Sequence, residues 1–180
     1  MTPAWPPSGD GAANPPDDDP ALQAHLLRIK GYMRGCGLLA FPSTETPLRD
    51  QLAQRSWRAL FADQMREALA VIEAEGIAPV STTPLPASLT PFILKLPDAL
   101  FTRIAASMVK IDPKARSSMW EDLQRGRRTE IDHLQGLIVA LAQRHGLPAP
   151  LSTRIVALIR EAERAAKGSP GLSAEQVRAG

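Results

Sequence analysis

The sequence has little cysteine, few aromatic residues and no long apolar run. Cys36 is the single cysteine among 180 residues, which excludes an internal disulfide and a metal site built from cysteines. No apolar run approaches the roughly 20 residues that cross a bilayer. The first residues also lack the basic start and apolar core of a secretory signal. From these absences we expect a cytoplasmic protein with no membrane partner.

Charge and histidine content are equally modest. A formal net charge of +2 is too small to indicate a nucleic-acid or membrane-surface protein by itself. The three histidines are His25, His133 and His145. The last two fall on one expected helix, about 18 Å apart along its axis, and one ion cannot bridge that distance. No H-E-x-x-H motif is present, so we expect no metal site.

The two ends of the chain have tail-like compositions. Residues 1–20 carry six prolines and an acidic run, and they bury too little apolar surface to offset chain entropy, which predicts a disordered tail. The sequence determines the structure of residues 21–46 poorly, and the one element that it indicates there is a short helix over Ala21–Arg34. Residues 167–180 contain few large apolar side chains, which predicts a frayed tail.

Residues 47–166 carry strong helical patterns and no period-two strand pattern. Gly126 and Gly146 indicate helix ends, and Thr129 with Asp132 resembles a helix-capping pair. We therefore expect an all-α domain of six or seven helices over residues 47–166. The predicted helices cover Pro47–Gly76, Leu89–Leu96, Pro97–Lys110, Ser117–Gly126, Thr129–Gly146 and a last segment from Leu151.

The stretch Ala115–Asp132 is unusually polar for a segment between apolar helices. Its basic residues are Arg116, Arg125, Arg127 and Arg128. A nucleic-acid site is one interpretation of these arginines, and a solvated turn partly neutralised by neighbouring acids is the other. Nucleic-acid readers usually add further basic patches or stacking aromatics, and the chain has only 4% aromatics. We favour the solvated turn and expect no nucleic-acid partner.

Ser118 and Glu130 are the residues of this stretch best placed to carry chemistry. Ser118 lies at a predicted helix N-terminus, where backbone N–H groups and the helix dipole favour a carboxylate ligand. Glu130 follows the turn at Gly126, so both side chains can face one pocket. The alternative is structural, with Ser117 or Ser118 as a helix cap and Glu130 as a first-turn acid. The preferences of helix caps and of the helix dipole support the functional and the structural interpretation equally well.

Three motifs resemble a known family. S-S-M-W-E-D-L-Q-R-G-R-R-T-E-I-D-H-L-Q-G, followed by A-Q-R-H-G-L-P-A-P-L-S, is similar to the C-terminal domain of 2-dehydropantoate 2-reductase, also called ketopantoate reductase. T-P-L-R-D-Q-L and M-R-E-A-L-A-V-I-E-A-E-G-I resemble the long helix of that domain. The resemblance covers residues 46–163. It implies an all-helical domain like that of 6-phosphogluconate dehydrogenase, joined in the family to an N-terminal Rossmann domain.

The resemblance also implies an activity and site residues. Family members reduce 2-dehydropantoate to pantoate with NADPH, in pantothenate biosynthesis. Ser118 matches the family's substrate-binding serine, and Glu130 matches the active-site glutamate that holds the substrate hydroxyl. The family's general acid is a lysine, expected near residues 31–41, and Lys30 is the nearest lysine in this chain. The asparagines that follow the lysine in the family have no counterpart here.

No strand followed by G-x-G-x-x-G is present for NADPH. We therefore expect a substrate-binding and catalytic half that binds no NADPH alone and is inactive alone. It would act with a separate Rossmann-domain chain or as a homodimer. The alternative is a non-catalytic helical module for dimerisation or partner binding, derived from the reductase.

Overall fold

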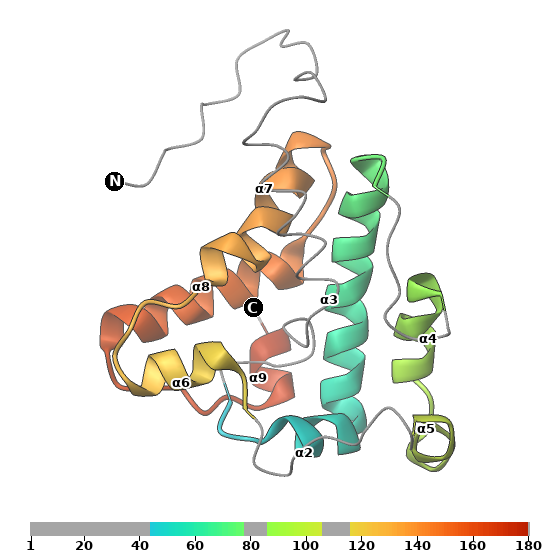
Figure 1. The fold of residues 1–180 in the computed structure, drawn as a ribbon, viewed down its shortest axis with the longest axis horizontal. Coiled ribbons are helices and arrows are strands. Elements are labelled where there is room, and N and C mark those ends of the chain that lie inside the picture. Colours follow the sequence, from blue (N-terminus) through green and yellow to red (C-terminus); the bar gives the residue numbers. More distant parts are fainter. Residues whose placement is uncertain (1–43, 78–85, 106–115, 180) are drawn as a thin grey trace, which may run out of the picture.

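The computed structural model describes residues 44–77, 86–105 and 116–179, and these residues form helices and no strand. The all-α prediction is confirmed. Within this part of the chain, no helix combines the length and apolar character needed to cross a membrane. The elements, shown in Figure 1, are α2 (Leu48–Ala53), α3 (Arg55–Ala74), η2 (Ala87–Leu89), α4 (Thr90–Leu94), α5 (Asp98–Ala105), α6 (Ser118–Gln124), η3 (Ile131–His133), α7 (Gln135–Arg144), α8 (Pro150–Ala165) and α9 (Ala174–Arg178).

Helix α3 is the central element of the fold. Figure 1 shows α4 along one side of α3, with α7 and α8 on the other side. The first half of α3 buries Trp57, Leu60 and Phe61 in a core shared with α6, α8 and α9. The second half buries Val71 and Ile72 in a second core shared with α7. Each core removes a stripe of apolar surface from water, which is the main term that stabilises the domain.

The single helix predicted over Pro47–Gly76 is wrong at one point, because Gln54 is extended and separates α2 from α3. Neither proline nor glycine stands at the break. Instead, the Arg58 guanidinium donates to the carbonyls of Leu52 and Ala53, at 2.9 and 3.0 Å. The last carbonyls of α2 are satisfied by a side chain rather than by further helix. A long-range partner of this kind leaves no local signal in the sequence.

Arg58 also ties α4 and α5 to α3. Its side chain is fully buried and donates to the carbonyls of Leu94 and Leu96, both at 3.1 Å. It contacts the Asp98 carboxylate at 2.5 Å and lies over the Phe101 ring, 4.2 Å from its centre. A buried guanidinium is tolerated only when its donors are satisfied in this way.

The helices predicted over Leu89–Leu96 and Pro97–Lys110 are observed in shorter form. The first is the 3-10 turn η2 followed by α4, which ends at Leu94. The second is α5, described as far as Ala105, and its predicted remainder lies outside the described residues. The predicted disordered tail and the helix over Ala21–Arg34 also lie outside them.

The predicted frayed tail over residues 167–180 is wrong, because the segment ends in helix α9. Ser173 accepts from the Gln176 backbone, and the Gln176 side chain accepts from the Ser173 backbone, which makes a capping box. Val177 is fully buried in the core beside α8 and α3. The S-x-x-Q pattern at Ser173 was therefore a local signal for this helix.

The helix predicted to begin at Thr129 is also wrong at its start. Residues 131–133 form the 3-10 turn η3, and α7 begins only at Gln135, after Leu134. Thr129 and Asp132 form no capping box, because Thr129 bonds to Glu163 of α8 and Asp132 to Arg160. The predicted ends at Gly126 and Gly146 are confirmed, since both residues have positive φ angles, 62° and 65°.

Candidate active site

Ser118 is the first residue of α6 and is not its N-cap, so its hydroxyl is available at the surface. Ser117 is the N-cap, and its hydroxyl accepts from the Trp120 backbone N–H at 3.1 Å. Met119 and Leu123 are each only 2% exposed and fix α6 on the core. Ser118 is exposed on the outer side of this helix. The structure thus separates the two serines that the sequence left as alternative caps.

Ser118 and Glu130 are brought into contact by the turn between α6 and η3. The Ser118 hydroxyl donates to Glu130 Oε1 at 3.3 Å, although the residues lie twelve positions apart. Gly126 ends α6 with φ 62° and turns the chain back. Both side chains are exposed, so a hydroxyl and a carboxylate stand together at the surface. When a ligand binds, the Ser118 hydroxyl can turn to donate to a ligand oxygen, and the Glu130 carboxylate can accept a hydrogen bond from a ligand hydroxyl.

The backbone on both sides of Glu130 is held in place. Thr129 donates its backbone N–H and its hydroxyl to Glu163 Oε1, at 2.7 and 2.8 Å. The Thr129 hydroxyl oxygen also accepts from the Ile131 N–H at 3.2 Å. Ile131 itself is 1% exposed and packs in the core. Glu130 is therefore an exposed side chain on a fixed backbone, as a binding site requires.

Glu163 and the aromatic contact beside α6 are not marked by any pattern in the sequence. Glu163 lies on α8, 34 positions from Thr129, so nothing local marks it as a partner. The Arg116 guanidinium lies over the Trp120 ring, 4.3 Å from its centre, and donates to the Glu45 carbonyl. A cation placed over an aromatic face is a favourable contact. It also takes Arg116 out of the group of free basic residues near Ser118.

A separate cleft of about 310 Å³ lies between α3, α4 and α9. Neither Ser118 nor Glu130 lines it. Its lining residues are Arg55, Ser56, Ala59, Asp63, Lys95, Ala174, Glu175 and Arg178.

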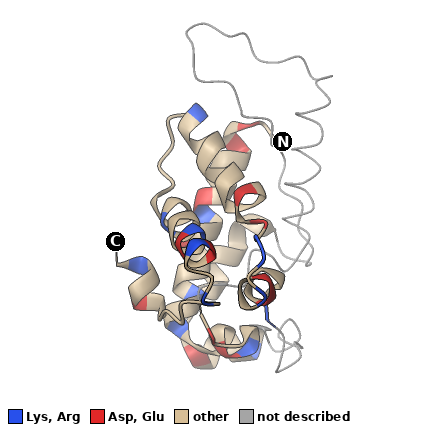
Figure 2. Ribbon diagram, turned by 90° about the vertical axis from the view of Figure 1, so that its left-hand side faces the viewer, with Lys and Arg blue, Asp and Glu red and all other residues tan. Residues whose placement is uncertain are grey.

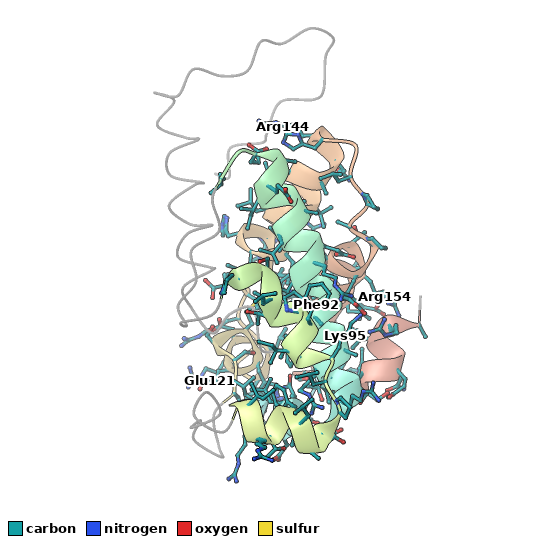
Figure 3. All side chains as sticks on the ribbon, turned by 90° about the vertical axis from the view of Figure 1, so that its right-hand side faces the viewer. Phe92, Lys95, Glu121, Arg144 and Arg154 are labelled. Atoms are coloured by element: carbon teal, nitrogen blue, oxygen red, sulfur yellow. The ribbon has the colours of Figure 1, made fainter. Side chains whose placement is uncertain are left out.

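Ion pairs cross this cleft. Asp63 is paired with Lys95 at 2.5 Å and with Arg178 at 2.7 Å, and Figure 3 shows Lys95 on the side of α4 nearest α9. Burial raises the pKa of Asp63, but hydrogen bonds and charges from Lys95 and Arg178 outweigh it, so the pKa lies below 3.8. The cleft is a place where charged side chains join α9 to α3.

Lys30 and the histidines are the other residues that the sequence offered for chemistry. Lys30, the candidate general acid, lies outside the described residues, and its position relative to Ser118 and Glu130 stays a prediction. His145 contacts Glu75 Oε1 at 2.7 Å. In the described ranges, no group of three or more histidine, cysteine or acidic residues is arranged to hold a metal ion.

Comparison with known proteins places this chain in a family. Residues 43–163 match the family described as "Ketopantoate reductase PanE/ApbA C terminal". The chain belongs to this family. The chain is similar to a solved structure of a PanE/ApbA family ketopantoate reductase from Ralstonia eutropha JMP134, with 28% sequence identity and a TM-score of 0.54. The search of curated proteins found no match.

The part of the chain that matches the ketopantoate reductase C-terminal family includes Ser118, Thr129, Glu130 and Glu163. Helix α9 lies beyond it. The chain spans 44% of the length of the Ralstonia eutropha reductase, and 84% of this chain is covered. The described residues contain no strand, turn and helix of the kind that holds a dinucleotide pyrophosphate.

Proposed function

We propose that this chain is the substrate-binding half of a ketopantoate reductase, with 2-dehydropantoate as substrate and pantoate as product. The contact between Ser118 and Glu130 carries the proposal. It joins the two residues that the family resemblance implies for substrate, and it presents them on a surface rather than within the core. A cap and a first-turn acid, the structural alternative, would not require the two side chains to meet.

In this proposal the two side chains have different tasks. Ser118 donates a hydrogen bond to an oxygen of the keto acid, and the Glu130 carboxylate accepts a hydrogen bond from the substrate hydroxyl. The clamp between Thr129 and Glu163 keeps Glu130 in one position, which lowers the entropy lost on binding. Lys30 is the candidate proton donor to the carbonyl oxygen. NADPH supplies the hydride in the family. The nucleotide-binding half would hold NADPH beside this domain, and the reaction would take place in the cytoplasm.

Calorimetric titration of the full chain with pantoate tests the proposal. We expect binding that weakens by about tenfold or more in S118A/E130A, because two hydrogen bonds involving a charged group are lost. The matched control, S88A/E73A, removes the same groups from exposed positions on η2 and α3. Equal affinity in both double variants, or no binding by the folded wild-type chain, would count against the proposal.

A second candidate function is a non-catalytic helical module that binds a partner chain or a second copy. It is supported by four large apolar side chains on η2, α4 and α5 that are 44–62% exposed, namely Leu89, Phe92, Leu100 and Ile104. Figure 3 shows Phe92 beside α4 in front of α3, where the Arg66 guanidinium lies 5.3 Å from the centre of its ring. Exposed apolar surface of this kind favours association. Light scattering that shows a monomer at tens of micromolar would argue against self-association.

A further inference from the structure

The connection between α6 and η3 carries two arginines that no group in the described part of the chain engages. Arg127 and Arg128 are both exposed, and neither side chain has a hydrogen bond or ion pair within residues 44–77, 86–105 and 116–179. Arg125, just before them, is paired with Glu121 at 3.3 Å. Figure 2 shows basic residues in blue along this part of the molecule.

The backbone that carries these arginines is held at both ends. Next to α6, the Arg127 N–H donates to the Asp122 carbonyl at 2.8 Å, after the positive-φ turn at Gly126. Next to η3, Thr129 is bonded to Glu163. The chain therefore runs back past α6 in a fixed path that ends where Glu130 meets Ser118. The Cα atoms of Arg128 and Glu130 are at most about 7 Å apart along this path.

A cation at this site would favour binding of the proposed ligand. A 2-keto acid or its hydroxy acid brings a carboxylate to a surface that already holds the Glu130 carboxylate, and like charges at close range oppose binding. Arg116, on the other side of Ser118, is engaged with the Glu45 carbonyl and Trp120. Arg160 is engaged with Asp132 at 2.8 Å. Arg127 and Arg128 are the nearby arginines left with free guanidinium groups in the described chain.

We propose that Arg127 and Arg128 bind the carboxylate of the ligand that Ser118 and Glu130 hold by its hydroxyl and keto groups. A guanidinium presents paired N–H donors that match the two oxygens of a carboxylate. This assignment rests on the proposed function and adds to it the residues that select an acid over a neutral analogue. It also assigns a binding role to the exposed arginines of the turn between α6 and η3.

The test compares pantoate with its primary amide, which keeps both hydroxyls and lacks the charge. Both are titrated into the full chain, with the wild type and the R127Q/R128Q variant examined by calorimetry and each fold verified by ¹⁵N NMR. The single variants R127Q and R128Q show how much each arginine contributes to the affinity for pantoate. The control R49Q/R103Q removes the same charge from exposed positions on α2 and α5.

We expect R127Q/R128Q to weaken pantoate binding by about tenfold or more, with little change for the amide, and R49Q/R103Q to bind as the wild type does. An equal loss in both double variants would mean a general charge effect and would overturn the assignment. Unchanged pantoate binding in R127Q/R128Q, together with loss in S118A/E130A, would overturn it and leave the proposed function standing. A wild-type chain that binds neither compound would overturn both.

Discussion

Glu163 of α8 accepts two hydrogen bonds from Thr129, one from its backbone N–H at 2.7 Å and one from its hydroxyl at 2.8 Å. The two residues lie 34 positions apart, and Thr129 directly precedes Glu130. One carboxylate therefore fixes the segment that carries the proposed substrate-binding acid to a helix of the core. Glu163 is a positioning residue in this account, because it acts on the ligand only through Glu130.

Replacing Glu163 should affect ligand binding as well as stability. We expect E163A to lower the free energy of unfolding by about 1–3 kcal/mol, since a partly buried pair of donors loses its acceptor. Pantoate affinity should also fall several-fold at temperatures where the variant is fully folded. The control E161A removes an exposed glutamate from the same helix. If E163A loses stability and binds pantoate normally, Glu163 has only a structural role.

Arg58 should tolerate no replacement, even by lysine. Its guanidinium reaches four carbonyls and the Asp98 carboxylate at once, and a lysine ammonium has only three donors. We expect R58K to cost about 3–5 kcal/mol in chemical denaturation, the usual range for breaking a buried charged network. R103K on the exposed side of α5 should stay within about 0.5 kcal/mol of the wild type. A loss below about 1 kcal/mol in R58K would contradict the role of Arg58 as the link between α3, α4 and α5.

The lowered pKa of Asp63 predicts a loss of stability in acid. Because the folded-state pKa lies below the unfolded value of 3.8, the unfolded chain binds the proton more readily. The stabilisation by Asp63 is complete above about pH 3.8 and disappears as the pH falls through the folded-state pKa. The difference in unfolding free energy between the wild type and D63N should therefore be constant near neutral pH and shrink below pH 4. A difference that grows in acid would contradict the assignment.

Helix α9 should contribute to the stability of the whole domain. Val177 is fully buried, so V177A should cost about 2 kcal/mol, and S173A should cost about 1 kcal/mol through loss of the cap. K167A, at an exposed position before the helix, serves as the control. Differential scanning calorimetry of the three variants measures these changes. Melting temperatures that match the wild type in V177A would mean that α9 is not docked in solution.

The features that the sequence predicted correctly are those with local causes. Apolar residues at helical spacing predicted the segments that form α3, α7 and α8, and the positive-φ glycines Gly126 and Gly146 marked helix ends. The proximity of Ser118 and Glu130 followed from one of these glycines. The break at Gln54 and the late start of α7 depend on Arg58 and Glu163, whose partners lie far away along the chain. Such contacts exist only after folding, so no local pattern reports them.

The most direct test of the central claim is a ¹⁵N NMR titration of the full chain with pantoate. The account predicts that the largest shift changes fall on Ser118, Thr129 and Glu130, with smaller ones on the arginines of the preceding turn, and that S118A/E130A reduces them. The cleft between α3, α4 and α9 should show no comparable changes. Changes centred on Asp63, Lys95 and Arg178, or none at saturating pantoate, would contradict the claim that Ser118 and Glu130 form the substrate site.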